Sequence, residues 1–141
     1  MKKERLKRAV ALRKRLDRLA SIRAAQAARH ADERRQACES LEAEQKTFAN
    51  APAEGPTSGA DLAWRDAVLE ASRAELKERR EEADEAEALR ADAAEAAQSS
   101  RGKTRALERA LVQTLEEERG NERRAEQQEL DEYAGRRSKR P

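Results

Sequence analysis

The chain contains a proline-free stretch, residues 61–134, that reads DLAWRDAVLEASRAELKERREEADEAEALRADAAEAAQSSRGKTRALERALVQTLEEERGNERRAEQQELDEYA. It consists almost wholly of Ala, Glu, Arg, Leu, Gln and Lys, which have the lowest free-energy cost of entering a helix. A continuous helix of this length would extend about 110 Å at 1.5 Å per residue. A chain of 141 residues cannot bury such a rod, so most of its surface must face water or a partner.

The composition of the whole chain argues against an ordinary globular core. Charged residues make up 43% of the sequence and aromatic residues only 2%, so there are too few large apolar side chains for such a core. Two classes fit this composition, a disordered polyampholyte and a long coiled coil. The periodicity of the apolar residues decides between them.

Neither a membrane-spanning helix nor a secretory signal is expected. No apolar run approaches the roughly 18 residues that a transmembrane helix needs, and residues 1–23 lack the continuous apolar segment of a signal peptide. Cys38 is the only cysteine, which excludes an intrachain disulfide and fits a reducing compartment. The expected location is cytoplasmic, or peripheral on a membrane.

Residues 3–48 are predicted to form a first helix. Apolar or small residues recur along it at spacings of mostly three and four, which is the helical period. The members of this stripe are Leu6, Ala9, Leu12, Leu16, Leu19, Ala20, Ala27, His30, Ala37, Leu41 and Phe48. The stripe weakens at Arg23, Gln26 and Glu33, where alanine-based pairing is expected. Cys38 is expected to be a small packing residue beside it.

Residues 49–60 are predicted to form the turn, because they hold the only interior cluster of strong helix breakers. The cluster contains Asn50, Pro52, Gly55, Pro56, Thr57, Ser58 and Gly59. Ser58 or Thr57 can cap the following helix, and Asp61 suits its first turn.

The second helix, residues 61–134, carries a seven-residue repeat. The repeat is typical of a coiled-coil interface and comprises Leu62, Leu69, Leu76, Ala83, Arg90, Ala97, Thr104, Leu111, Glu118 and Ala125. Ala86, Ala93, Leu107 and Leu115 lie at the intervening offsets. The prediction is an all-α fold of two long helices in an antiparallel coiled-coil hairpin, followed by a basic tail at residues 135–141.

Folding the helices back on each other gives an expected register. Leu41 should lie near Leu69, Phe48 near Leu62, and residue 3 near residue 107. The second helix would then continue about 27 residues, or about 40 Å, beyond its partner. Leu107, Leu111 and Leu115 share one face and would lie at or past the end of the first helix, largely uncovered. The alternative is a shifted register that covers these leucines. Gly102 and Gly120 mark weak points of the second helix.

No catalytic, cofactor or metal site is expected. Residues 97–104, AQSSRGKT, fit a permissive form of the phosphate-binding loop, but an Ala/Glu helix precedes them and no apolar strand exists to position that loop. His30 is the only histidine, so neither a zinc site nor a nucleophile–histidine triad can be built around it. A two-helix hairpin also offers no concave, desolvated site for catalysis or for a small-molecule substrate.

Positive charge is concentrated at both ends of the sequence. Residues 1–23 contain ten Lys or Arg against two acids, whereas residues 81–95 contain seven acids against Arg90. Arg5, Arg8, Arg13 and Arg15 in the first helix and Arg136, Arg137 and Arg140 in the tail surround the predicted open end. Such charge would steer the end of the rod toward an acidic partner.

Three C-terminal segments stand out, namely RALERAL at residues 105–111, EER at 117–119 and EQQELDEYA at 126–134. These segments resemble the FliJ/YscO family of type III export stalk proteins. The chain is also similar to this family in length and in its basic helical start. The start, MKKERL, lacks aromatic residues often present in flagellar members, so the choice between flagellum and injectisome stays open.

The resemblance implies a non-enzymatic hairpin at the inner face of the cell membrane, similar to the stalk of rotary ATP synthases. Its open end, with Leu107, Leu111 and Leu115 and the arginines named above, would enter a hexameric export ATPase. The family also contacts a membrane export gate protein and export chaperones. Trp64 and Val68 could form the gate contact, but packing of Trp64 on Phe48 is the favoured interpretation. No cofactor is implied.

Two other classes remain as alternatives. A nucleic-acid-binding coiled coil could use residues 1–23 as a phosphate-contacting arm. Acids over the rest of the chain and the absence of aromatic residues in this arm make nucleic acid a less favoured partner. A homodimeric structural spacer, with the helices joined in a four-helix assembly, is the second alternative.

Overall fold

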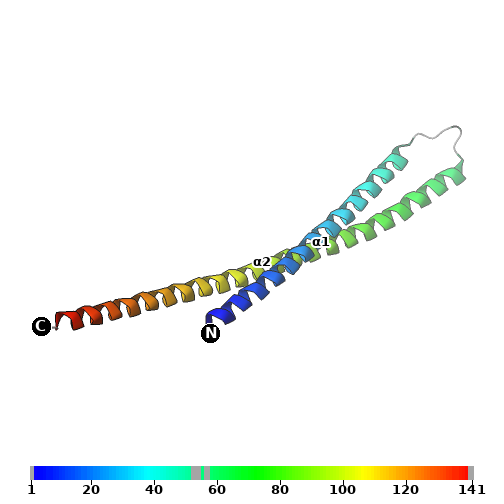
Figure 1. Cartoon of the computed structure of the whole chain (residues 1–141). Coiled ribbons are helices and arrows are strands. Elements are labelled where there is room, and N and C mark those ends of the chain that lie inside the picture. The colour runs from blue at the N-terminus through cyan, green and yellow to red at the C-terminus, as the bar shows by residue number, and fades with distance from the viewer. Residues whose placement is uncertain (1, 52–54, 56–57, 140–141) are drawn as a thin grey trace. The chain divides into compact units, whose positions relative to one another are not determined.

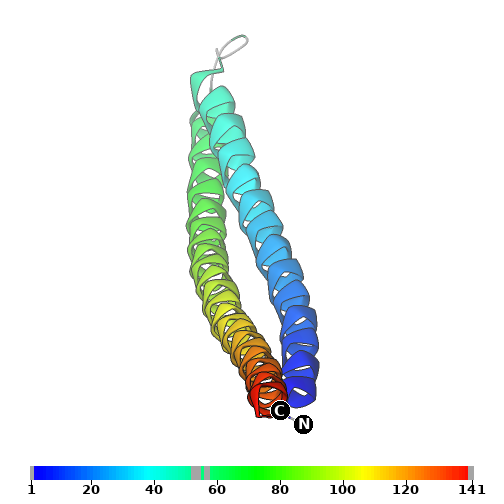
Figure 2. The same cartoon turned by 60° about the vertical axis from the view of Figure 1, so that its left-hand side comes forward.

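The computed structural model describes residues 2–51, 55 and 58–139, and all of its regular structure is helical. Helix α1 runs Lys2–Asn50 and helix α2 runs Gly59–Ser138. Both ribbons are continuous from end to end in two views (Figure 1) (Figure 2). The predicted all-α fold of two long helices packed against each other is confirmed, and both helices extend slightly beyond their predicted ends.

The chain divides into two units, each a pair of helical segments. The first unit combines Met1–Arg18 with Gln98–Pro141, and the second comprises Leu19–Ala97. In the first unit, Lys3 pairs with Glu118 while Lys14 pairs with Glu108. Numbers that rise on one helix therefore fall on the other, so the segments run antiparallel. In the second unit, Asp32 pairs with Arg90 and Glu42 with Arg80, which gives the same direction.

The start of α2 is fixed by reciprocal hydrogen bonds between Ser58 and Asp61. The backbone N–H of Asp61 donates to Ser58 Oγ at 3.1 Å, and the backbone N–H of Ser58 donates to Asp61 Oδ2 at 3.2 Å. This arrangement is a capping box, which satisfies amides that the first turn leaves without helical partners. The predicted cap is confirmed for Ser58. The predicted breakers Pro52, Pro56 and Thr57 lie outside the described residues.

The positions of α2 that approach α1 follow a regular alternation of three and four residues, as a coiled coil requires. Half-buried or buried residues in this series are Leu69, Ser72, Leu76, Arg79, Ala83, Ala86, Arg90, Ala93, Ala97, Ser100, Thr104, Leu107, Leu111, Thr114 and Glu118. The predicted heptad of α2 is therefore confirmed from Leu69 to Glu118. The predicted members Leu62 and Ala125 are exposed, and Ala125 lies beyond Glu118, the last position of the series.

Helix α1 packs with a different face from the one predicted near its start. The buried or half-buried residues that recur at spacings of three and four are Lys3, Leu6, Val10, Arg13, Asp17, Ala20, Ala24, Ala27, Ala31, Arg34, Cys38, Leu41, Gln45 and Phe48. Leu6, Ala20, Ala27, Leu41 and Phe48 were predicted correctly, and Cys38 is a buried free thiol as expected.

Leu12, Leu16, Leu19 and His30 were placed wrongly on the interface, because all four are exposed. The reason lies in the continuation of the heptad. The series that contains the leucines proceeds to Arg23, Gln26 and Glu33, whereas the observed series proceeds through alanines to Leu41 and Phe48. Between Ala20 and Ala31 the observed series has alanine at four successive interface positions, whereas the leucine series has charged or polar residues over the same turns.

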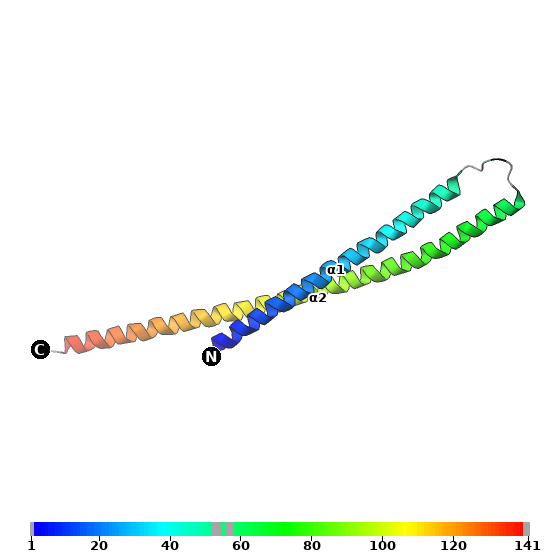
Figure 3. The ribbon, with the colours of Figure 1, turned by 45° about the vertical axis from the view of Figure 1, so that its right-hand side comes forward.

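The glycines of α2 do not interrupt it. Gly102 and Gly120 both lie inside the helix, and Figure 3 shows the α2 ribbon without a break. A Cβ added at either residue would meet no other atom within 4 Å. Neither glycine is therefore required by close packing, and the expectation of a weak point there concerns only the intrinsic helix propensity of glycine.

Candidate partner-binding surfaces

The three leucines predicted to dock into a ring lie within the paired part of the first unit. Leu107, Leu111 and Leu115 are half-buried, and ion pairs of α1 with α2 lie on either side of Leu111. Lys14 reaches Glu108 at 3.7 Å, and Lys3 reaches Glu118 at 3.7 Å. The expected pairing of residue 3 with residue 107 is wrong, and the alternative of a shifted register is the observed one.

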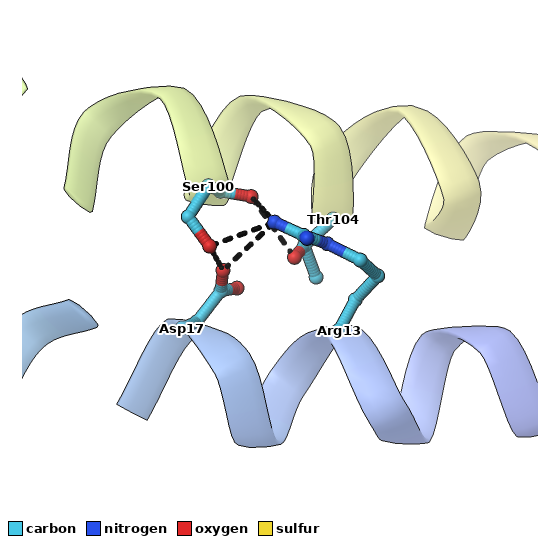
Figure 4. Close-up of polar contacts among 4 residues, drawn as sticks. All are labelled: Arg13, Asp17, Ser100 and Thr104. Carbon is cyan, nitrogen blue, oxygen red and sulfur yellow. Dashed lines mark hydrogen bonds and ion pairs between the residues drawn. The ribbon is translucent and has the colours of Figure 1, made fainter. Parts of the chain in front are cut away.

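Four polar side chains in this unit explain why the register differs from the predicted one. Figure 4 shows Arg13 and Asp17 of α1 facing Ser100 and Thr104 of α2. Arg13 Nη2 donates to Ser100 Oγ at 2.7 Å and to the Ser100 carbonyl at 3.0 Å. The Ser100 hydroxyl donates to Asp17 Oδ1, and the Thr104 hydroxyl donates to the Ser100 carbonyl at 3.1 Å. We name these four residues the polar cluster.

The polar cluster constrains the pairing because its members occupy interface positions. The Arg13 and Asp17 side chains are only 21% and 17% exposed, and Thr104 is buried. A half-buried charged group without its partners is disfavoured, and sliding α1 along α2 would separate Arg13 Nη2 and Asp17 from Ser100, which bonds to both. Alanine positions elsewhere fit many registers, so the polar cluster selects one.

The pKa of Asp17 is lowered from its ordinary value of 3.8. The largest cause is the hydrogen bond from Ser100, and the neighbouring Thr104 hydroxyl and the charges of Arg13 and Arg101 act in the same direction. Partial burial opposes this shift. The folded protein therefore favours the Asp17 carboxylate, which is the form that accepts these hydrogen bonds.

The predicted ring-binding arginines divide into two groups. Arg5, Arg8 and Arg15 on α1 and Arg136 and Arg137 on α2 are exposed, so their charges are available to a partner. Arg13 differs, because its guanidinium is engaged in the polar cluster. Arg140 lies outside the described residues.

Among the described residues of the first unit, no α1 segment lies beside the part of α2 beyond Glu118. Since Lys3 pairs with Glu118 and α1 begins at Lys2, α2 continues alone to Ser138, about 30 Å further. Figure 1 shows this C-terminal part of α2 beyond the start of α1. We name residues 119–138 the α2 extension. All its residues from 121 to 134 are exposed.

Two large apolar side chains protrude from the α2 extension, and neither was predicted as a site residue. Leu130 is 63% exposed and Tyr133 is 66% exposed, and together with Glu126 and Glu129 they line one shallow hollow. The spacing of three residues places Leu130 and Tyr133 on one side of the helix. The sequence contains the signal, a leucine and a tyrosine three residues apart in an otherwise polar segment, but in the expected register the preceding leucines are the uncovered ones.

The tip of the second unit is held by contacts around Phe48. The rings of Phe48 and Trp64 meet edge to face with 6.1 Å between centroids, which supports the favoured packing interpretation. Trp64 nevertheless remains 64% exposed. Val68 is half-buried and lines a hollow with Phe48 and Leu69, so it is not an open patch with Trp64.

Arg65 joins the start of α2 to the end of α1, and the sequence analysis did not predict this contact. Its Nη2 lies within hydrogen-bonding distance of the carbonyl oxygens of Phe48, Ala49 and Ala51, at 3.0, 2.9 and 2.9 Å. These carbonyls lie at the end of α1, where helical acceptors lack partners and the helix dipole is negative. The guanidinium carbon also lies 5.8 Å from the Phe48 ring centroid. Arg65 therefore caps α1 from α2.

Over residues 2–51, 55 and 58–139, no group of three or more His, Cys, Asp or Glu side chains is arranged to hold a metal ion. In the same part of the chain, neither helix has the length of apolar sequence that crossing a bilayer requires. Comparison with known protein families, with curated proteins and with solved structures gives no match.

Proposed function

We propose that the chain is a non-enzymatic stalk protein of a bacterial type III, flagellar-type export apparatus, in which the α2 extension enters a hexameric export ATPase. The observation that supports this proposal most directly is the single helix that continues about 30 Å beyond the paired region. A lone helix of 10–12 Å diameter is a slender element that can enter a central channel. The family resemblance of residues 105–137 supports the same assignment.

The side chains of the α2 extension suit such a docking. Leu130 and Tyr133 offer apolar contact area, and large exposed apolar groups gathered on one side commonly mark a binding surface. Arg136 and Arg137 follow within the next turn and are exposed. Positive charge at the leading end would steer the helix into an acidic channel and make association dependent on salt. Leu107, Leu111 and Leu115 would instead stiffen the base of the extension by packing against α1.

The remaining partners of the proposal belong to the other parts of the hairpin. The protein would act in the cytoplasm at the inner face of the cell membrane, where the tip could contact the export gate through the exposed part of Trp64. Export chaperones would be further partners. Trp64→Ala separates packing from gate binding, because loss of stability with retained binding indicates packing, whereas retained stability with lost binding indicates contact with the gate.

The experiment that tests the proposal is recovery of partners by the tagged full-length chain from the cell that encodes it. A hexameric ATPase should be recovered at low salt and released as salt is raised. The double variant Leu130→Ser with Tyr133→Ser should fail to recover it, whereas the exposed control Leu89→Ser should recover as much as the unaltered chain. Recovery of the ATPase by the double variant at the unaltered level would contradict docking through the α2 extension.

A further inference from the structure

One side of α1 near its start combines exposed aliphatic side chains with arginines. Leu12, Leu16, Leu19 and Ile22 expose 58, 39, 50 and 53% of their surface. They follow at spacings of four, three and three along one uninterrupted helix, so they share one side of it. Val10 and Ala20, by contrast, belong to the series that packs on α2.

Arginines accompany these aliphatic residues on the same side. Arg8 lies one turn before Leu12, and Arg15 lies one turn before Leu19, and both arginines are exposed. The acids of this part of α1 are compensated. Glu4 pairs with Lys7 at 3.8 Å, and Asp17 is engaged in the polar cluster. This side, which we name the α1 outer face, therefore has a positive charge.

This mixture of aliphatic and arginine side chains favours a binding partner whose surface accepts apolar and cationic groups together. Leucines can enter the boundary of the acyl chains while arginine stems extend along it and place their guanidinium groups among headgroup phosphates. Basic amphipathic helices that combine Leu with Lys or Arg bind bilayers in this manner. The charge complementarity is with an anionic bilayer.

A second copy of the chain fits the α1 outer face less well. The acidic part of α2, residues 81–95, would complement its charge. The large apolar side chain exposed in that part is Leu89, which could cover only one of the four aliphatic residues. Nucleic acid would pair with the arginines but would leave the aliphatic residues without a role.

We propose that the α1 outer face, formed by Leu12, Leu16, Leu19 and Ile22 with Arg8 and Arg15, binds the surface of an anionic lipid bilayer. This site goes beyond the proposed stalk function and does not depend on an ATPase partner. Binding lays α1 along the membrane surface, and neither helix crosses the bilayer.

Flotation of the full-length chain with vesicles tests this proposal. The vesicles are phosphatidylcholine alone, or phosphatidylcholine mixed with phosphatidylglycerol. The triple variant Leu12→Ser, Leu16→Ser, Leu19→Ser removes apolar contact, and Leu89→Ser with Leu130→Ser is its exposed control. The pair Arg8→Gln with Arg15→Gln removes charge, and Arg136→Gln with Arg137→Gln is the matched control. All these side chains are exposed, so circular dichroism should show unchanged helix content.

The unaltered chain should float with the anionic vesicles and not with phosphatidylcholine alone. The leucine variant should bind at least about tenfold more weakly, and the Arg8–Arg15 variant about thirtyfold more weakly, since each cation near an anionic surface contributes about a factor of five. Both controls should bind nearly as the unaltered chain does.

Three results would overturn the proposal. The first is unchanged vesicle binding by the leucine variant, which would show attraction by charge alone. The second is absence of binding to anionic vesicles, which would then be explained by a second copy of the chain if ultracentrifugation shows a dimer that the leucine variant dissociates. The third is salt-dependent binding to duplex DNA in place of vesicle binding.

Discussion

Arg65→Met is expected to loosen the tip of the hairpin without disturbing the rest of it. Methionine keeps the apolar stem of the side chain but removes the donors that reach the carbonyls of Phe48, Ala49 and Ala51. One Nη2 atom carries two hydrogens, so it satisfies at most two of these acceptors at once. A hydrogen bond from a charged donor contributes about 1.5 kcal/mol or more when shielded, and two of these contacts are exposed. The expected loss is therefore about 1–2 kcal/mol.

The assay uses Trp64, which is the only tryptophan and lies beside Arg65 in contact with Phe48. Urea unfolding followed by Trp64 fluorescence should shift to lower urea by roughly 0.5–1 M, because the urea dependence of stability for small proteins is about 1–3 kcal/mol per M. The exposed control Arg73→Met should leave this transition in place. A Trp64 transition that is the same in Arg65→Met and in the unaltered chain would refute the capping role of Arg65.

Three further results are expected. The Asp17→Asn variant should be less stable than the unaltered chain, with the largest difference in unfolding free energy at neutral pH. This difference should shrink as the pH falls below 3.8. The lowered pKa means that the carboxylate stabilises the fold above the pKa of the unfolded chain and that this contribution disappears as pH drops through the folded pKa; a loss independent of pH would contradict it. Leu111→Asp should lower the thermal midpoint of the free protein, because a charge replaces a half-buried interface leucine, whereas Leu130→Asp should leave it nearly unchanged; equal midpoints for the two variants would oppose the observed register. Gly102→Ala should stabilise α2 by up to about 1 kcal/mol in chemical unfolding, since an added Cβ meets no atom within 4 Å, and a lower stability would mean that the helix needs glycine there.

The sequence predicted the elements of the fold well because each depends on local signals. Alanine, glutamate and leucine favour the helices, the breaker cluster marks the turn, and Ser58 with Asp61 forms the cap. The heptad of α2 could be read directly because its apolar members recur at strict intervals. These features require no knowledge of which residue of one helix meets which residue of the other.

The register of the two helices could not be predicted from the same signals. The start of α1 carries two possible interface series, and hydrophobicity favours the one with more leucines. The observed series places Arg13 and Asp17 against Ser100 and Thr104, and hydrophobicity alone gives such polar side chains no reason to face a partner helix. Their burial becomes favourable only when the two helices are aligned so that complementary polar groups lie opposite each other.

The candidate site changed together with the register. Leu107, Leu111 and Leu115 would have been uncovered in the expected register, but the observed pairing of Lys3 with Glu118 brings them beside α1. The exposed apolar residues of the first unit instead include Leu12 and Leu130. A shift of about ten residues in pairing was therefore enough to exchange the buried and the exposed leucines.

The most direct test of the stalk proposal is the rate of ATP hydrolysis by the export ATPase of the same cell, measured with and without the full-length chain. Stimulation is expected from the unaltered chain and from Leu89→Ser, and the double variant Leu130→Ser with Tyr133→Ser should fail to stimulate at unchanged helix content. Full stimulation by the double variant, or no stimulation by the unaltered chain, would show that the α2 extension does not couple to the ATPase.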